Sequence, residues 1–217
     1  MKRLRFNTGQ KIRFFAAGEY GTNSFRPHYH ALFFGLRLDD LTPYKKSPQG
    51  YPYFNSATLD KCWTDDEGNS KGFIVVGRLT WETCAYTARY IMKKQRGPEA
   101  AESYAALGLS PEFSLMSRRP GIARQYYDDH PEMWKYDLIN LSTSQGGKSM
   151  PHPLYFRRLF EIDDPLTARE FSEVRRLKAI RKTSQKMRLT DKEYCDMLVA
   201  EEEVRLSRIK ALRRNLI

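Results

Sequence analysis

Residues 28–34 read His-Tyr-His-Ala-Leu-Phe-Phe and combine two histidines with an apolar run. The run is typical of a β-strand, on which side chains two residues apart point to the same face. His28 and His30 therefore present two imidazoles together, and neutral imidazoles bind divalent ions such as Mn or Zn. A His-x-His pair on a strand is more often structural than metal-binding, so its surroundings have to decide.

The segment before this strand predicts its partner. Ile12–Ala17 is rich in β-forming residues, and the turn-rich residues 18–27 favour an antiparallel pair. Glu19 follows the first strand and is expected to stand beside the histidines. Two histidines and one carboxylate would leave coordination positions open for phosphate chemistry. The alternative is that Glu19 is a solvated turn residue.

A second functional pattern lies in a helix predicted from Thr80, a favourable N-cap, to about Gln95. At about 100° per residue, two tyrosines and two lysines share one face: Tyr86, Tyr90, Lys93 and Lys94. The opposite face is apolar and carries Cys84, Ala88 and Ile91. A tyrosine hydroxyl titrates near pH 10, roughly, so as a nucleophile it needs nearby cations and a polarised phosphate. The lysines supply cations, unless they only stabilise the helix C-terminus.

The balance of 37 Lys and Arg against 26 Asp and Glu gives a net charge of +11 and a pI near 9.6. This charge predicts a polyanionic partner, nucleic acid before an anionic membrane. No apolar run approaches the roughly 20 residues that span a bilayer, and the N-terminus lacks a secretory h-region. The protein is expected to be intracellular, with its three cysteines reduced.

Shorter patterns predict the other elements. Phe73–Val76 is expected to be a strand, Ala57–Trp63 a short helix, and Leu38–Asn55 an irregular connection. Residues 112–121 predict a strand closed by a Pro-Gly turn. Arg118 and Arg119 at this turn are candidate phosphate contacts, with two ordinary surface arginines as the alternative.

The C-terminal part differs in composition. Residues 142–148 read as a hairpin loop, and charged helices are expected from Pro165. Residues 175–217 hold 13 Lys and Arg against 6 Asp and Glu. A solvated amphipathic hairpin is the plain interpretation, and binding to the DNA backbone or to a partner is the sharper one.

Four segments in order resemble the replication initiator proteins of the microviruses, small single-stranded DNA bacteriophages of the gokushovirus type: residues 18–21, 26–31, 86–94 and 112–121. These proteins are similar to HUH-type rolling-circle endonucleases such as the coliphage gene A protein. The resemblance covers about residues 11 to 160. It implies an α+β fold with a central antiparallel sheet flanked by helices, and the two-histidine motif on a middle strand.

The resemblance also implies a domain plan. Residues 1–160 would form an HUH-type nicking domain, and residues 161–217 a basic helical extension. Members of the family have another strand before the helix at which this chain starts. The chain is therefore expected to lack an N-terminal strand, which would leave a strand edge open.

The resemblance assigns roles to the site residues. His28 and His30 match the metal-binding histidines, Tyr86 and Tyr90 the paired tyrosines, and Lys93 and Lys94 the lysines that follow them. Glu19 is carried over as the third ligand of Mg or Mn. The implied enzyme nicks single-stranded DNA at the phage origin through a 5′-phosphotyrosine link, starts rolling-circle replication, and rejoins the displaced strand.

The expected partners are single-stranded origin DNA and host replication proteins, in the cytoplasm of the host bacterium, with no membrane. Two alternatives stay open. One is a non-catalytic DNA-binding remnant of such an initiator, and the other is a two-histidine hydrolase of small phosphoesters.

Overall fold

The computed structural model describes residues 1–21, 25–47, 50–93, 98–143 and 146–211. These residues fall into two compact units, one ending at Ile122 and the other beginning at Ala123. The domain boundary expected at residue 160 lies inside helix α6 (Leu154–Asp163) of the second unit. Each unit is described by itself below.

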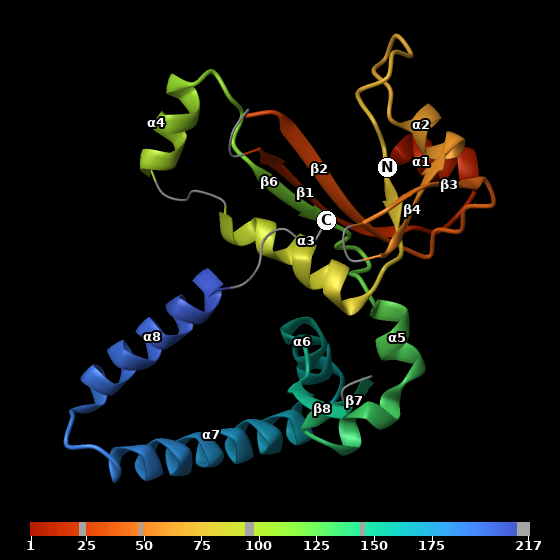
Figure 1. The fold of residues 1–217 in the computed structure, drawn as a ribbon. Coiled ribbons are helices and arrows are strands. Elements are labelled where there is room, and N and C mark those ends of the chain that lie inside the picture. Colours follow the sequence, from red (N-terminus) through yellow and green to blue (C-terminus); the bar gives the residue numbers. More distant parts are fainter. Residues whose placement is uncertain (22–24, 48–49, 94–97, 144–145, 212–217) are drawn as a thin grey trace. The chain divides into compact units, whose positions relative to one another are not determined.

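The first unit contains the antiparallel pair that the sequence predicts. Strand β1 (Arg13–Tyr20) pairs along its whole length with β2 (Pro27–Phe34), and its other edge pairs with β6 (Phe113–Met116). The sheet order is β2-β1-β6, and both pairings are antiparallel (Figure 1). The two-histidine motif was expected on a middle strand. Among the described strands the middle one is β1, and β2 lies at an edge.

A second small sheet occupies residues that were expected to be irregular. It consists of β3 (Leu41–Lys46), β4 (Pro52–Ser56) and β5 (Val76–Gly77), in the order β3-β4-β5. All six residues of β3 are exposed, so the strand has no alternation of apolar and polar residues to detect. The strand expected over Phe73–Val76 is wrong except at Val76, because Phe73 and Val75 are exposed in a loop.

Four helices belong to the described part of the first unit: α1 (Lys2–Thr8), α2 (Ala57–Cys62), α3 (Trp81–Lys93) and α4 (Pro98–Ala106). Leu4 of α1, Ile12 and Leu59 of α2 form a buried cluster, and Phe33 and Val76 pack against it. These contacts join the helices to both sheets by burying apolar surface.

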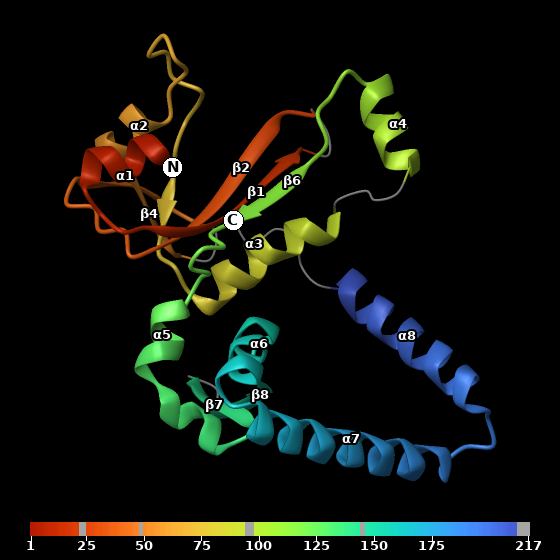
Figure 2. The same ribbon diagram turned by 180° about the vertical axis from the view of Figure 1, so that it is seen from behind.

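Helix α3 begins where the sequence predicts. The Thr80 side chain accepts from Thr83 N at 3.3 Å, and the Thr83 hydroxyl accepts from Thr80 N at 2.8 Å, which is a reciprocal cap. The helix contacts both β1 and β2, and the two views agree that it runs beside this sheet (Figure 2). Its contact with the sheet determines what surrounds the two-histidine motif.

The second unit is built around aromatic side chains. Tyr127, Phe156 and Phe160 are buried together, and the Trp134 ring stacks on Phe160 with centroids 4.0 Å apart. Its elements are α5 (Arg124–Asp129), a 3-10 turn (Pro131–Lys135), β7 (Leu138–Thr143), β8 (Gly146–Pro151), α6, α7 (Pro165–Met187) and α8 (Tyr194–Ala211). The hairpin β7-β8 and the C-terminal helices confirm those two expectations.

The α+β class with antiparallel sheets is therefore confirmed. Over the ranges given above, no helix is both long enough and apolar enough to cross a bilayer.

Candidate functional site

The register of β1 and β2 brings three candidate ligands to one face of the sheet. Glu19 lies directly opposite His28, and Ala17 lies opposite His30. Cross-strand partners share a face, and so do residues two apart on one strand. Glu19, His28 and His30 are therefore on the same face, which is the face that α3 covers at Ala17.

Glu19 and His30 are in contact. The Glu19 Oε1 atom lies 3.4 Å from His30 Nε2, and their side chains are 9% and 24% exposed. Two ligands bound at about 2.1 Å to one ion stand roughly 3.0 to 3.4 Å apart, depending on whether the geometry is octahedral or tetrahedral. The spacing of these two atoms thus suits two ligands of one ion. In the part of the chain that the structure describes, no three His, Cys, Asp or Glu side chains converge into a complete ligand set.

His28 lies on the same face but outside this contact. Its ring packs over Gly21, where an added Cβ would stand 3.1 Å from His28 Cε1. Glycine at position 21 therefore makes room for the imidazole at the end of the strand pair. His28 is exposed, so its ring can turn about its side-chain bonds without displacing other groups of the core.

Tyr86 lies beside the histidine and carboxylate. It is 8% exposed, and its ring centroid is 6.1 Å from that of His30, at an interplanar angle of 73°. The tyrosine face of α3 is thus the face buried against the sheet, and Ala88 is exposed. This corrects the apolar face that the sequence suggested. The sheet surface beneath α3 is partly polar, and a tyrosine brings both a ring and a hydroxyl to it.

The other tyrosine and the lysines are less fully placed. Tyr90 and Lys93 belong to α3, but their side chains lie outside the described residues, as does the whole of Lys94. Tyr90 follows Tyr86 by one helical turn, so the shared helix face follows from the backbone. Arg118 and Arg119 are exposed beyond the end of β6, where Arg118 forms a bridge with Gly121.

The strand that carries Glu19 is fixed at its end by β6. Tyr20 N donates to Glu112 Oε1 at 2.8 Å, and the Tyr20 hydroxyl donates to Ser110 O at 3.0 Å. These bonds hold the residue next to Glu19 from both its backbone and its side chain. Glu112 belongs to a segment that the sequence singled out only for its arginines.

Tyr53 is a neighbour of the site that the sequence did not reveal. It lies on β4, and burial raises the pKa of its hydroxyl, an effect that a hydrogen bond with Ser47 partly opposes. The negative charge that Tyr86 would carry on ionisation raises the pKa of Tyr53 further. The two phenols are therefore close enough to interact. No pattern marked Tyr53, because β4 lies in the stretch that was expected to be irregular.

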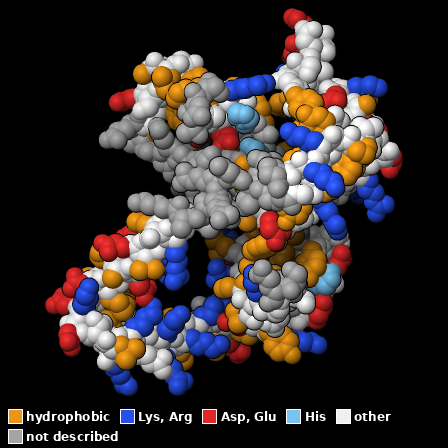
Figure 3. Space-filling view, viewed as in Figure 1, with side chains coloured by type: hydrophobic (Ala, Val, Ile, Leu, Met, Phe, Trp, Pro, Cys, Tyr) orange, Lys and Arg blue, Asp and Glu red, His pale blue; other side chains and the backbone are white. Residues whose placement is uncertain are grey.

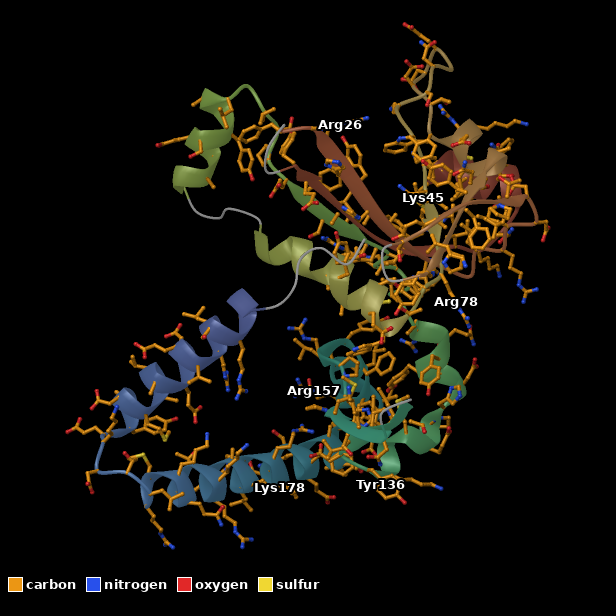
Figure 4. The ribbon with its side chains drawn as sticks, in the orientation of Figure 1. Arg26, Lys45, Arg78, Tyr136, Arg157 and Lys178 are labelled. Atoms are coloured by element: carbon orange, nitrogen blue, oxygen red, sulfur yellow. The ribbon has the colours of Figure 1, made fainter. Side chains whose placement is uncertain are left out.

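Basic side chains share this face of the first unit. Figure 3 shows the histidines and a carboxylate together at its surface, with Lys and Arg side chains on either side. Arg26, Lys45 and Arg78 are on this face, and they come from the start of β2, from β3 and from the residue after β5 (Figure 4). A phosphodiester at the histidines would thus lie between positive charges.

Comparison with known proteins gives the class first. Residues 1–95 match the family of the replication-associated protein ORF2. This match covers β1, β2 and most of α3, which are the elements that carry the site.

The particular relatives are phage proteins. The chain is 36% identical over 208 residues to replication-associated protein ORF2 of Spiroplasma virus 4, covering 94% of this chain and 61% of that protein. It is 24% identical over 170 residues to replication-associated protein VP4 of Bdellovibrio phage phiMH2K, covering 77% and 49%. These matches confirm the resemblance to the replication initiators of microviruses.

A third relative is shorter in its match. Replication-associated protein ORF4 of Chlamydia phage 1 is 32% identical over 101 residues, which cover 43% of this chain and 24% of that protein. The chain thus spans about a quarter to three fifths of the length of these relatives. No solved structure matches it significantly.

Proposed function

We propose that this protein starts phage DNA replication in the host cell by nicking single-stranded origin DNA and later rejoining it. The observation that carries the proposal is the meeting of Glu19, His30 and Tyr86 on one sheet face. A carboxylate and an imidazole at ligand spacing, with a phenol beside them, suit the transfer of a phosphodiester to tyrosine. The replication-associated relatives support the same role.

Glu19 and His30 would hold a divalent ion, and His28 would complete the set by a turn of its exposed side chain. Such an ion, Mg or Mn, would polarise the scissile phosphate when bound. The protein's own residues do the rest. Arg26 and Lys45 attract the backbone to this face, and the packing of α3 on β1 and β2 keeps the phenol beside the ligands.

The tyrosine is the proposed nucleophile. Its oxygen bonds to phosphorus as the bond between phosphorus and the 3′ oxygen breaks. The phenol loses its proton and the departing 3′ oxygen gains one, so the DNA 5′ end is joined to the protein and a 3′ hydroxyl is free to prime synthesis. One phosphodiester replaces another, so the reverse reaction can join strands. A second tyrosine allows a second transfer.

The direct test is to incubate the protein with 5′- and 3′-labelled single-stranded DNA and Mn or Mg, followed by a denaturing gel. We expect a protein–DNA adduct that carries the 3′ label and a free fragment that carries the 5′ label. Binding without an adduct would favour the non-catalytic remnant. Release of phosphate from a small phosphoester without DNA attachment would favour the two-histidine hydrolase.

Replacing Glu19 with glutamine is expected to weaken Mn affinity by about 10- to 100-fold, as when a metal site loses a supporting group. The amide keeps the size of the side chain but removes its negative charge. Isothermal titration with Mn measures the effect, independently of nicking. Glu102→Gln on α4, where the side chain is exposed, is the matched control. If the Glu19→Gln and parent titrations coincide while both proteins unfold at the same temperature, the third ligand lies elsewhere.

A further inference from the structure

The second sheet of the first unit exposes a pair of aromatic rings. Tyr44 and Phe73 are 46% and 64% exposed, and their ring centroids are 5.2 Å apart at an angle of 61°. The Lys45 Nζ atom stands 5.3 Å from the centroid of the Tyr44 ring. We call these three residues the aromatic platform. Two large rings beside an ammonium group form a surface with both apolar area and positive charge.

The aromatic platform is connected to the candidate site through neighbouring side chains. Lys45 on β3 lies opposite Tyr53 on β4, so both side chains share a face of the second sheet. Tyr53 interacts electrostatically with Tyr86, whose ring is 6.1 Å from that of His30. Lys45 therefore stands between the rings of the platform and the histidines. Figure 4 shows Lys45 on the face that also carries Arg26.

The chemistry of the aromatic platform selects the occupant. Successive bases of a single strand stack on protein aromatics, while their phosphates follow nearby cations. Duplex DNA keeps its bases stacked on one another and offers no free base faces to such rings. An apolar protein partner would bury the rings but would gain nothing from Lys45. Orange and blue side chains adjoin on this face in Figure 3, as a nucleic acid strand requires.

We infer that the aromatic platform binds the single-stranded DNA next to the scissile phosphate, with bases stacked on Tyr44 and Phe73 and a backbone phosphate at Lys45. The inference rests on the proposed function for the identity of the substrate. It adds where the strand runs and why the enzyme takes single strands rather than duplex. The bases there are held by stacking, so this contact tolerates different sequences.

The test measures binding without nicking. Fluorescence anisotropy with labelled oligothymidine, in EDTA, compares the parent with Tyr44→Leu and Phe73→Leu, which keep apolar bulk but remove the ring. Each is expected to raise the Kd by about 5- to 150-fold, corresponding to about 1–3 kcal/mol of stacking. Tyr44→Phe keeps the ring and should bind like the parent. Phe6→Leu on α1, at a side chain that is 89% exposed, is the matched control.

Two further readouts separate stacking from charge. Lys45→Ala should reduce the slope of log K against log salt by about 0.7 for a single strand, since one phosphate contact is lost. A DNA duplex should bind the leucine variants and the parent with equal affinity. Leucine variants that bind oligothymidine as tightly as the parent, or that lose duplex binding equally, would overturn the inference. Absence of nicking in the parent would instead count against the proposed function, because binding in EDTA does not depend on it.

Discussion

Replacing either His28 or His30 with alanine is expected to abolish nicking and to leave the affinity for single-stranded DNA nearly unchanged. Loss of a direct ligand should cost more than the roughly 100-fold upper limit seen when only a supporting group is lost. DNA affinity depends on many Lys and Arg side chains, so it should survive the loss of one imidazole. Adduct formation on a denaturing gel and anisotropy in EDTA measure the two properties separately.

The two histidines should differ in one respect. His30 contacts Glu19 and the Tyr86 ring, and its side chain is 24% exposed, whereas His28 is exposed and packs over Gly21. His30→Ala should therefore also lower the melting temperature slightly, because it removes packing beneath α3. His130→Ala, at a half-buried histidine in the second unit that stacks on Tyr126, is the control that removes an imidazole elsewhere. Full nicking by the double variant of His28 and His30 would refute a shared metal site.

The strand pair that carries these residues could be predicted because its pattern is local. An apolar run after His30 and a turn-rich segment before it are sufficient to predict β2 and its antiparallel partner β1, and the register then follows. Thr80 likewise announces the start of α3, since a capping side chain needs only its neighbours in sequence.

The second sheet could not be predicted in the same way. Strand β3 exposes every residue, and β5 has only two, so burial imposes no alternation on either sequence. Tyr53 and the aromatic platform stayed hidden for the same reason. Their importance comes from neighbours on other strands and on α3, which no local pattern reports.

The inner face of α3 was mistaken for a different reason. Hydropathy alone assigns Cys84, Ala88 and Ile91 to the interior and the tyrosines to the surface. The sheet under this helix carries Glu19 and His30 beside Phe15 and Ala17, so the side that packs best is the one with Tyr86. The nature of the opposing surface decides which side of a helix is buried, and that surface is formed by residues far away in sequence.

The paired tyrosines lead to the second large effect. Tyr86→Phe and Tyr90→Phe should each still form a covalent adduct on a simple cleavage substrate, because the remaining hydroxyl lies one turn, about 5.4 Å, along α3. The double variant should form none, and each single variant should fail at strand transfer even where cleavage survives. Phenylalanine is the suitable replacement, since it preserves the ring that packs Tyr86 at 8% exposure and removes only the oxygen.

Two other tyrosines serve as controls. Tyr53→Phe removes the neighbouring phenol from β4 and should leave adduct formation in place. Tyr127 is 7% exposed in the aromatic core of the second unit, and its hydroxyl donates to Asp163 Oδ2 at 2.6 Å. Burial first, and this hydrogen bond second, raise the pKa of Tyr127, which makes it a poor nucleophile. An adduct that persists in the double variant of Tyr86 and Tyr90, mapped by peptide sequencing, would identify a nucleophile outside α3.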